Sequence, residues 1–335
     1  MKKRVLFIID GYPCLSQTYK ENEIKYASLS YEIVVASFGS SPAKYRSHHP
    51  YLPITSTDDL KKIIREFQPD IIHGHYFHNL PLLDMASRMA GGAPFTIRTH
   101  SYDLINIPPE RLKELATYSK SSRCYGIICF PFLRSLLTQA GVPESAIVAD
   151  FPVVDYSRFY DRSQNGSYVF NTGAMIPKKD IASYAIIARL QTSKRFLYCP
   201  VGHNNSSCER NFSELNSRLG SPVDLIANVE PYDMPKLYKS CEWLVYTANS
   251  SLATVGWPMA IAEAQASGCG VLMQNIRPDI QDYIGGAGFV FNEITEAVDI
   301  LSSPYPSELR ELGFKLAKRS DIRVNIQKLF RLWEK

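Results

Sequence analysis

The sequence Gly256-Trp-Pro-Met-Ala-Ile-Ala-Glu-Ala-Gln-Ala-Ser-Gly-Cys-Gly270, followed by Val271-Leu-Met273, decides the fold. Gly256 permits a tight turn, and Pro258 suits the first position of a helix, where its missing N–H would have no partner. Gly268 ends the helix, and the apolar residues after it predict a short buried strand. The order predicts a helix over residues 258–266 whose N-terminus opens on a glycine turn.

Such a helix N-terminus suits a phosphate group, because it presents N–H groups and the positive end of the helix dipole. Glu263 lies about one and a half turns into the helix, where it can accept hydrogen bonds from a sugar hydroxyl beside that phosphate. The segment therefore predicts a binding site for a nucleotide diphosphate. The alternative is an ordinary helix whose Glu263 faces solvent.

Apolar runs and helical stretches alternate along the rest of the chain, which predicts parallel βαβ units in doubly wound α/β sheets. Expected strands are residues 5–9, 32–37, 70–73, 94–98 and 126–129, then 168–171, 196–201, 223–226, 243–246 and 270–273. Expected helices are residues 21–29, 58–67, 181–190, 211–219, 234–238 and 321–333, with Ser56 or Thr57 capping the second. Ligands of such sheets bind beyond the carboxyl ends of the strands.

Two Rossmann-like domains are the economical interpretation, because 335 residues suffice for two domains of about 150 residues each. A polar stretch over residues 161–167 interrupts the pattern between them. We expect an N-terminal domain over residues 1–160 and a C-terminal domain over residues 161–318. Residues 319–335 form a last helix, which in the simplest case packs on the second domain.

Composition narrows the class of protein. A net charge of +4 and a pI near 8.5 suit an anionic small molecule or a transient contact with an acidic membrane, but are too weak to indicate nucleic acid binding. Seven scattered cysteines without a C-x-x-C pair indicate reduced thiols. The basic start precedes an apolar run of only five residues, so we expect a first strand rather than a signal peptide, and a cytoplasmic protein.

The opening segment resembles the donor-binding motif of family 4 glycosyltransferases of the GT-B fold, which has a Glu, seven residues, and then Glu-Ala with a glycine turn. The resemblance implies two Rossmann-like domains facing a cleft, with the last helix returning to the N-terminal domain. It implies that the donor contacts residues of the turn and the helix start, namely Gly256, Trp257, Pro258, Met259 and Ala260. Glu263 matches the second Glu of the pair, whereas Val255 stands at the first.

The segment after the first strand resembles the opening of exopolysaccharide or colanic-acid-type members of this family. It lacks G-x-G-x-x-G, so the ordinary dinucleotide fingerprint is absent. The resemblance places Gly11, Tyr12 and Ser16 on the acceptor side of the cleft. The alternative is a turn in which Ser16 or Thr18 caps the next helix.

Three histidines follow the strand at residues 70–73, in His73-Gly-His-Tyr-Phe-His78. A metal site is one interpretation, but no carboxylate or cysteine lies at ligand spacing, so we expect none. The family often has His-x-His here, which implies that His75 lines the cleft. Packed or capping histidines are the alternative.

Thr99-His100-Ser-Tyr-Asp103 follows the next strand and resembles the family's Thr-x-His-Gly-x-Asp stretch. The resemblance implies that His100 is a catalytic residue beside the donor sugar. A neutral imidazole can hydrogen-bond a sugar hydroxyl or carbonyl there. The alternative is a histidine at a helix start that its neighbours cap.

In the second half, the turn starting at Gly173 resembles the family's Gly-Arg-Leu and Lys-Gly residues, which neutralise the donor diphosphate. Lys179, with Lys178 as neighbour, keeps the lysine, but Ala174 replaces the arginine. Lysine remains a competent point charge for phosphate. The alternative is a solvated turn.

The resemblance extends to two further donor contacts. Gly202 matches a glycine turn after the next strand, and the backbones of Asn228 and Val229 match the loop against which the base rests. The loss of the first Glu at Val255 implies altered donor choice, weak activity, or transfer of its role to one of four polar neighbours: Asn249, Ser250, Ser251 or Thr254.

The resemblance implies a retaining, metal-independent glycosyltransferase, with Glu263 and His100 as the central residues. It would use a UDP- or GDP-type sugar donor and no cofactor, and a glycan, lipid-linked or other hydroxyl acceptor at the inner membrane surface. A sugar-nucleotide epimerase and a non-catalytic nucleotide-sugar-binding subunit are the alternatives.

Overall fold

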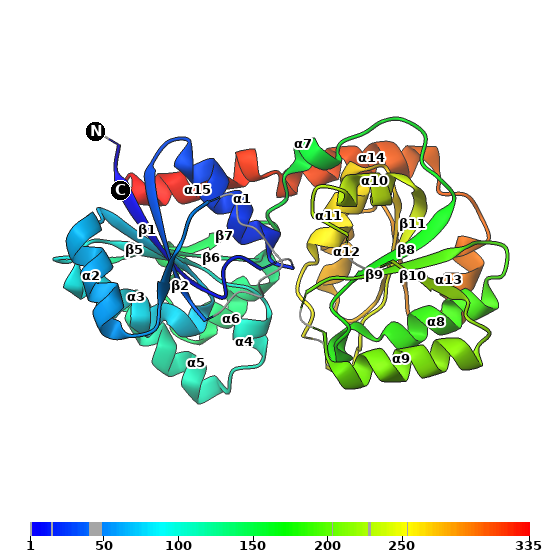
Figure 1. Ribbon diagram of the computed structural model, residues 1–335, viewed down its shortest axis with the longest axis horizontal. Coiled ribbons are helices and arrows are strands. Elements are labelled where there is room, and N and C mark those ends of the chain that lie inside the picture. The colour runs from blue at the N-terminus through cyan, green and yellow to red at the C-terminus, as the bar shows by residue number, and fades with distance from the viewer. Residues whose placement is uncertain (1, 15, 40–48, 203, 227–228, 253) are drawn as a thin grey trace. The chain divides into compact units, whose positions relative to one another are not determined.

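The computed structural model describes residues 2–14, 16–39, 49–202, 204–226, 229–252 and 254–335. The chain divides into two compact units: unit 1 comprises residues 1–153 and 322–335, and unit 2 comprises residues 154–321. Each unit is a parallel sheet covered by helices (Figure 1), which confirms the predicted α/β class. Within the described residues, no helix has both the length and the apolar composition needed to cross a bilayer.

Unit 1 is built on a seven-stranded parallel sheet in the order β3-β2-β1-β4-β5-β6-β7. Its strands are β1 (Arg4–Asp10), β2 (Glu32–Phe38), β3 (Leu52–Ile54), β4 (Ile71–His75), β5 (Phe95–Arg98), β6 (Cys124–Cys129) and β7 (Ile147–Ala149). Its helices are α1 (Thr18–Ser28), α2 (Thr57–Phe67), α3 (Leu80–Met89), α4 (Tyr102–Ile105), α5 (Pro109–Ala116), α6 (Arg134–Gln139) and the C-terminal α15 (Ile322–Trp333).

Local sequence explains where these elements begin. In β1, side chains 5–9 are all buried, as a continuous apolar run in a central parallel strand requires. Ser56 caps α2: its hydroxyl accepts from the Asp59 amide at 3.2 Å, and the Asp59 carboxylate accepts from the Ser56 amide at 2.9 Å. Sequence analysis missed β3 and β7, which have only three residues each.

The last helix belongs to unit 1, where α15 packs beside α1 (Figure 1). Its apolar side chains Ile326, Leu329 and Trp333 are buried in the same core as Phe7 of β1. The ring of Trp333 meets that of Phe7 edge-on, with centroids 6.0 Å apart. The simplest expectation, packing on the second half of the chain, is therefore wrong.

Unit 2 repeats the design with a six-stranded parallel sheet in the order β10-β9-β8-β11-β12-β13. Its strands are β8 (Tyr168–Gly173), β9 (Phe196–Pro200), β10 (Val223–Leu225), β11 (Cys241–Tyr246), β12 (Gly270–Gln274) and β13 (Phe289–Phe291). Its helices are α7 (Tyr156–Phe159), α8 (Ile181–Leu190), α9 (Ser206–Arg218), α10 (Met234–Lys239), α11 (Met259–Ala266), α12 (Asp279–Ile284), α13 (Ile294–Leu301) and α14 (Ser307–Ala317).

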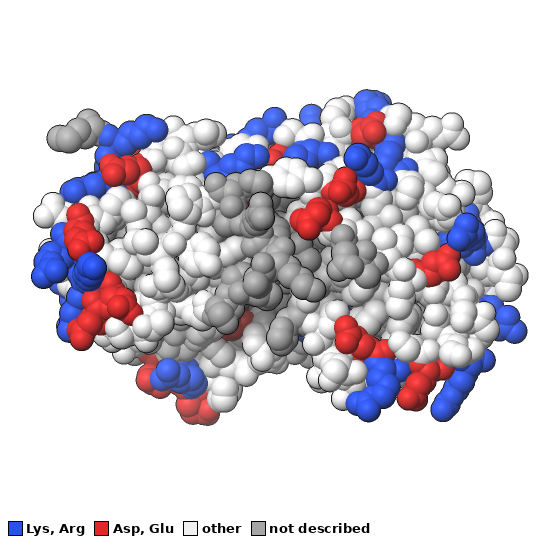
Figure 2. Space-filling model, in the orientation of Figure 1, with Lys and Arg blue, Asp and Glu red and all other residues white. Residues whose placement is uncertain are grey.

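Surface charges of both signs are interspersed. On the face drawn in Figure 2, basic and acidic side chains alternate over each unit without an extended patch of one sign. This matches the small excess of 37 basic over 33 acidic residues.

A buried ion-pair network fastens unit 1 together. The Arg98 side chain donates from Nε to Glu23 at 2.7 Å and from Nη2 to Asp150 at 3.3 Å, and Lys328 reaches Asp150 at 2.8 Å. Arg98, Glu23 and Asp150 are almost fully buried. The four residues come from α1, the end of β5, the residue after β7, and α15, so one network joins both ends of the unit.

We predict that Arg98→Met destabilises the protein by about 3–5 kcal/mol, because the buried Glu23 carboxylate then loses its cationic partner and Asp150 keeps only Lys328. Urea denaturation followed by circular dichroism measures the change. As a control, Arg134→Ala removes a surface ion pair with Glu144 and costs less than about 1 kcal/mol. Equal losses for the two variants would contradict the role of the network.

Candidate functional site

Lys179 marks the candidate site of unit 2. The strand order reverses between β8 and β11, which is the place where doubly wound sheets bind ligands. Lys179 lies there, with Nζ 4.4 Å from the centre of the Tyr246 ring at the end of β11. At the end of β8, a Cβ built on Gly173 would lie only 3.5 Å from Lys179 Cε. The structure thus brings the predicted residues Gly173 and Lys179 together.

The backbone at Lys179 is held in place, but among the described residues its ammonium has no counter-ion. The Thr247 hydroxyl donates to the Lys179 carbonyl at 3.0 Å, and the Asn249 amide donates to the Lys178 carbonyl at 3.0 Å. No carboxylate of the described residues forms an ion pair with Lys179. Burial lowers the pKa of Lys179 to about 7, and the charge of Lys178 acts in the same direction. A bound anion would supply the missing negative charge.

Gly202 joins this group from the neighbouring loop. Gly202 has φ +96°, a conformation that favours glycine. The preceding amide, of Val201, donates to the Gly173 carbonyl at 3.1 Å, and the Tyr198 hydroxyl donates to the same carbonyl at 2.8 Å. The predicted glycine turns are therefore adjacent at the carboxyl ends of β8 and β9.

The helix of the opening motif is present as α11, and it starts at Met259, one residue later than predicted. Met259 and Ala260 carry its first N–H groups, and both residues are partly exposed. Trp257, by contrast, is buried: its indole donates to Asp279 at 2.8 Å and stacks on Tyr283 with centroids 4.8 Å apart. Trp257 therefore fixes the loop by packing.

The loop before α11 is anchored away from the helix start. Val255 is only 3% exposed, and its carbonyl accepts from Arg277 Nη1 at 2.6 Å. Arg277 also pairs with Asp279 at 2.8 Å. The side chain at position 255 is part of the core, so an apolar residue there satisfies packing. Thr254, one of the proposed substitutes for the missing acid, is buried as well.

Glu263 lies deeper in α11 and has a specific partner. The Tyr238 hydroxyl donates to Glu263 Oε2 at 2.8 Å. Burial raises the pKa of Glu263 to about 7, although the hydrogen bond from Tyr238 and the charge of Arg158 oppose the shift. The alternative of a solvent-facing Glu263 on an ordinary helix is therefore wrong.

Sequence analysis missed Arg158. Its Nη2 donates to the Pro231 carbonyl at 2.5 Å, and its guanidinium lies 4.7 Å from the centre of the Tyr232 ring. Arg158 thereby ties α7 to the loop that was expected to meet the base. Val229 in that loop is partly buried, whereas Asn228 lies outside the described residues.

In unit 1 the strand order reverses between β1 and β4. Gly11 follows β1 with φ +56°. Tyr12 is buried: its amide donates to Ser37 at 2.9 Å and its hydroxyl donates to Glu21. Ser16 Oγ lies 3.5 Å from Cys14 Sγ, and the residue that precedes α1, Gln17, makes no side-chain capping bond.

His75 and His100 lie side by side at the same edge of the sheet. His75 Nδ1 and His100 Nε2 are 3.2 Å apart. His75 is fully buried, whereas His100 is partly exposed, so His75 lies behind His100. The Tyr19 ring packs 4.4 Å from that of His100, and the Asp103 carboxylate accepts from the His100 amide at 2.7 Å.

Glu23 is the residue of unit 1 that sequence spacing could not find. Its Oε2 lies 3.0 Å from His75 Nε2 and 3.6 Å from His73 Nε2, and all three side chains are fully buried. The premise that these histidines lack a carboxylate partner is therefore wrong in three dimensions. The three groups could hold a metal ion by element and distance. However, Arg98 already balances Glu23, so a divalent cation would leave uncompensated positive charge in a buried site.

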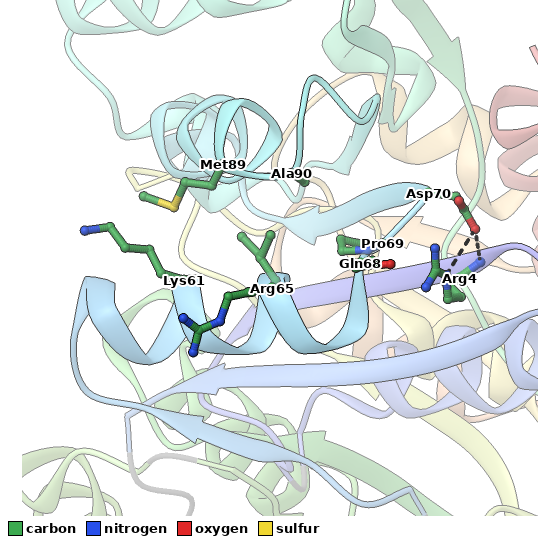
Figure 3. A pocket seen from close by; sticks show the side chains of 9 residues that line it. Arg4, Lys61, Arg65, Gln68, Pro69, Asp70, Met89 and Ala90 are labelled. Atoms are coloured by element: carbon green, nitrogen blue, oxygen red, sulfur yellow. Dashed lines mark hydrogen bonds and ion pairs between the residues drawn. The ribbon is translucent and has the colours of Figure 1, made fainter.

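Unit 1 also has an open hollow of about 590 Å³ at the opposite edge of its sheet (Figure 3). It is lined by Arg4, Lys61, Ile64, Arg65, Gln68, Pro69, Asp70, Met89 and Ala90. Arg4 pairs there with Asp70 at 3.6 Å, at the amino ends of β1 and β4. Because ligands of such sheets bind at the carboxyl ends, this hollow is separate from the candidate site.

Comparisons with known proteins identify the fold. Residues 14–128 match a family model described as glycosyl transferase 4-like. The fold is similar to that of Anabaena HepE, solved with UDP-glucose (TM-score 0.79, 14% identity, 98% of each chain covered). It is also similar to sucrose-phosphate synthase from Thermosynechococcus elongatus (TM-score 0.78, 11% identity, 99% and 98% covered). A search of curated protein sequences finds no match. The chain therefore has the GT-B fold.

We predict that Lys179 titrates with a midpoint near pH 7 in the free protein, because burial disfavours its charged form. NMR titration of lysine side chains labelled with ¹³C measures the midpoint, and the signal is assigned by its absence in Lys179→Arg. A midpoint above pH 9.5 would show that the ammonium is solvated, contrary to the structure.

Proposed function

We propose that this glycosyl transferase 4-like protein of the GT-B fold transfers a sugar from a nucleotide diphosphate sugar to an acceptor hydroxyl. One observation supports this above the others: Lys179 lies half-buried at the strand-order reversal of unit 2, and no carboxylate within the described ranges pairs with it. A diphosphate is the anion that such a group, together with the start of α11, would hold.

The chemistry assigned to unit 2 is electrostatic. As the glycosidic bond breaks, the leaving diphosphate gains negative charge, and Lys179 with the first N–H groups of α11 stabilises it. Fixed charges in a partly desolvated site act more strongly than they would in water. We propose that the reaction needs no metal and retains the anomeric configuration, and that His100 of unit 1 orients the sugar.

For the donor, we propose a UDP-sugar, because HepE was solved with UDP and with UDP-glucose. Glu263 would accept hydrogen bonds from the ribose hydroxyls, with Tyr238 holding its carboxylate in place. We propose a glycan or lipid-linked hydroxyl as acceptor, used at the membrane surface. Thermal-shift screening with UDP, GDP and their sugars tests the base, and a larger shift with GDP would contradict this choice.

A non-catalytic nucleotide-sugar-binding protein is the second candidate. The buried Val255 and the small Ala174 favour it, because the resemblance places a Glu and an Arg at these positions. The two functions differ in product. Binding of nucleotide sugar without hydrolysis or transfer during long incubation would favour the binding protein, and an epimerised donor would identify an epimerase.

We predict that Lys179→Met weakens UDP binding about tenfold or more but leaves uridine binding within about twofold, because only the diphosphate meets the ammonium. Isothermal titration calorimetry of both ligands measures the two effects. Lys178→Met is the matched control, because it removes the same charge one position earlier from a lysine that is not assigned to the diphosphate, and its effect on UDP should be smaller. Equal losses for UDP and uridine would remove Lys179 from the diphosphate site.

The pKa of Lys179 also predicts the pH dependence of binding. A bound diphosphate favours the charged amine, so binding takes up a proton above about pH 7 and UDP affinity falls as the pH rises from 7 to 9. Calorimetry in two buffers of different ionisation enthalpy counts the protons. Proton uptake that persists in Lys179→Met would assign it to another group.

For Glu263, we predict that Glu263→Gln weakens UDP binding about five- to tenfold and weakens 2′-deoxy-UDP binding less, because the lost hydrogen bonds run to ribose hydroxyls. Tyr238→Phe, which frees the Glu263 carboxylate without removing it, should have a smaller effect of the same kind. Competition binding of the two nucleotides measures the difference. Unchanged affinity in Glu263→Gln would place the carboxylate outside the site.

A further inference from the structure

A chain of three polar side chains runs from the core of unit 1 to its surface. It starts at Glu23 of α1, passes through His75 at the end of β4, and ends at His100 after β5. Glu23 and His75 are fully buried, and His100 is partly exposed. The proposed function uses only His100, so the two buried members remain to be explained.

The inner contact determines which nitrogen of His75 carries the proton. Burial alone would raise the pKa of Glu23, but Arg98, His73 and His75 together hold it well below its usual range, so Glu23 is ionised. An ionised carboxylate only accepts hydrogen bonds. His75 Nε2 lies 3.0 Å from Glu23 Oε2, although the angle falls short of hydrogen-bond geometry. At that distance the carboxylate would repel a lone pair on Nε2. His75 therefore has its proton on Nε2.

The contact between His75 and His100 determines which nitrogen of His100 is protonated. Burial lowers the pKa of His75 to about 4, so its ring is neutral and Nδ1 is an acceptor. His100 Nε2, 3.2 Å away, must then donate. The two ring planes differ by 11° with centroids 5.5 Å apart, which fits a hydrogen bond running roughly in the plane of both rings.

The remaining nitrogen of His100 is consequently an acceptor. Burial, reinforced by the charge of Arg98 and by His75, lowers the pKa of His100 well below its usual value, so the ring carries one proton, on Nε2. Within the described part of the chain, no hydrogen bond reaches His100 Nδ1. This atom is not among the buried polar atoms without a partner, so a ligand can reach it. A ligand that meets this atom must be a donor.

We propose that Glu23 and His75 are positioning residues that hold His100 in its Nε2-protonated form, so that Nδ1 accepts a hydrogen bond from a sugar hydroxyl. The inference rests on the proposed function for the identity of the ligand, but its tautomer assignment does not. It selects a hydroxyl donor over a carbonyl or phosphate oxygen, which can only accept.

His73 supplies a matched control for the experiment. It lies on the same face of β4 and is equally buried, and its Nε2 also faces Glu23, at 3.6 Å. Its Nδ1 bonds the Thr96 hydroxyl at 2.8 Å, and His73 makes no contact with His100 in the described structure. His73→Asn and His75→Asn thus remove similar buried groups, but only the second interrupts the chain.

The first measurement concerns the free protein. Long-range ¹H–¹⁵N NMR of histidine-labelled protein distinguishes protonated from unprotonated ring nitrogens. We expect His100 to be protonated at Nε2 alone in the wild type and in His73→Asn, and to become a mixture of tautomers in His75→Asn. A proton on His100 Nδ1 in the wild type, or an unchanged His100 in His75→Asn, would overturn the inference. Should His75→Asn fail to fold, the wild-type spectrum decides by itself.

The second measurement concerns the sugar. The donor sugar is compared with a panel of analogues that each lack one hydroxyl. In the wild type and in His73→Asn, the analogue that lacks the hydroxyl bound by His100 should have a kcat/KM about tenfold lower than the complete donor, as expected for a lost hydrogen bond. His75→Asn should lose this discrimination. If transfer is absent altogether, the proposed function fails while the NMR result still stands. If transfer occurs but the two variants discriminate equally, the inference alone fails.

Zn²⁺ provides a third arm, because Glu23, His73 and His75 could also be read as a metal site. We expect Zn²⁺ to leave the melting temperature of the wild type unchanged. A rise in the wild type that is lost in His73→Asn would assign the cluster to a metal and overturn the inference.

Discussion

The buried ion pair between Arg98 and Glu23 is the constraint on which unit 1 depends. A carboxylate on a helix that packs against the sheet would be strongly destabilising without a cation beside it. Arg98 supplies that cation from the end of β5, and Asp150 with Lys328 completes a network without net charge. Because the pair sits next to the carboxyl ends of β4 and β5, the stabilising charges also set the protonation of the histidines there.

Unit 2 uses the same sheet topology for a different electrostatic purpose. In both sheets the strand order reverses beside the first strand of the unit, so a gap between loops is created at the same topological position. Unit 1 fills the neighbourhood of this position with compensated charges and neutral imidazoles. In unit 2 the half-buried ammonium of Lys179 forms no ion pair with any carboxylate that the structure describes. Only the second arrangement favours an anion.

Regular patterns explain how much of this was predictable from the sequence. Continuous apolar runs predicted β1 and β11, and the helix at residues 181–190 was predicted to the residue, because burial on both faces of a parallel sheet leaves a strong signal. Of the three-residue strands, β10 was predicted, but β3, β7 and β13 were missed, because so few residues carry only a weak pattern. Contacts distant in sequence were also missed. Glu23 meets His75 fifty-two positions later, and no local spacing encodes that contact.

For two residues that a sequence motif singled out, the structure shows a packing role. Trp257 belongs to the predicted donor-binding segment, but its indole donates to Asp279 and stacks on Tyr283. Its contribution is to hold the start of α11 rigid. His75 was expected to line the cleft, and it lies fully buried behind His100. In each case a buried residue supports an exposed one, and a rigid support is what electrostatic stabilisation requires. Dipoles and charges that need not reorganise during a reaction stabilise developing charge at no additional cost. The helix start and desolvated lysine proposed for unit 2 meet that condition with few charged groups, and so does the histidine of fixed tautomer proposed for unit 1.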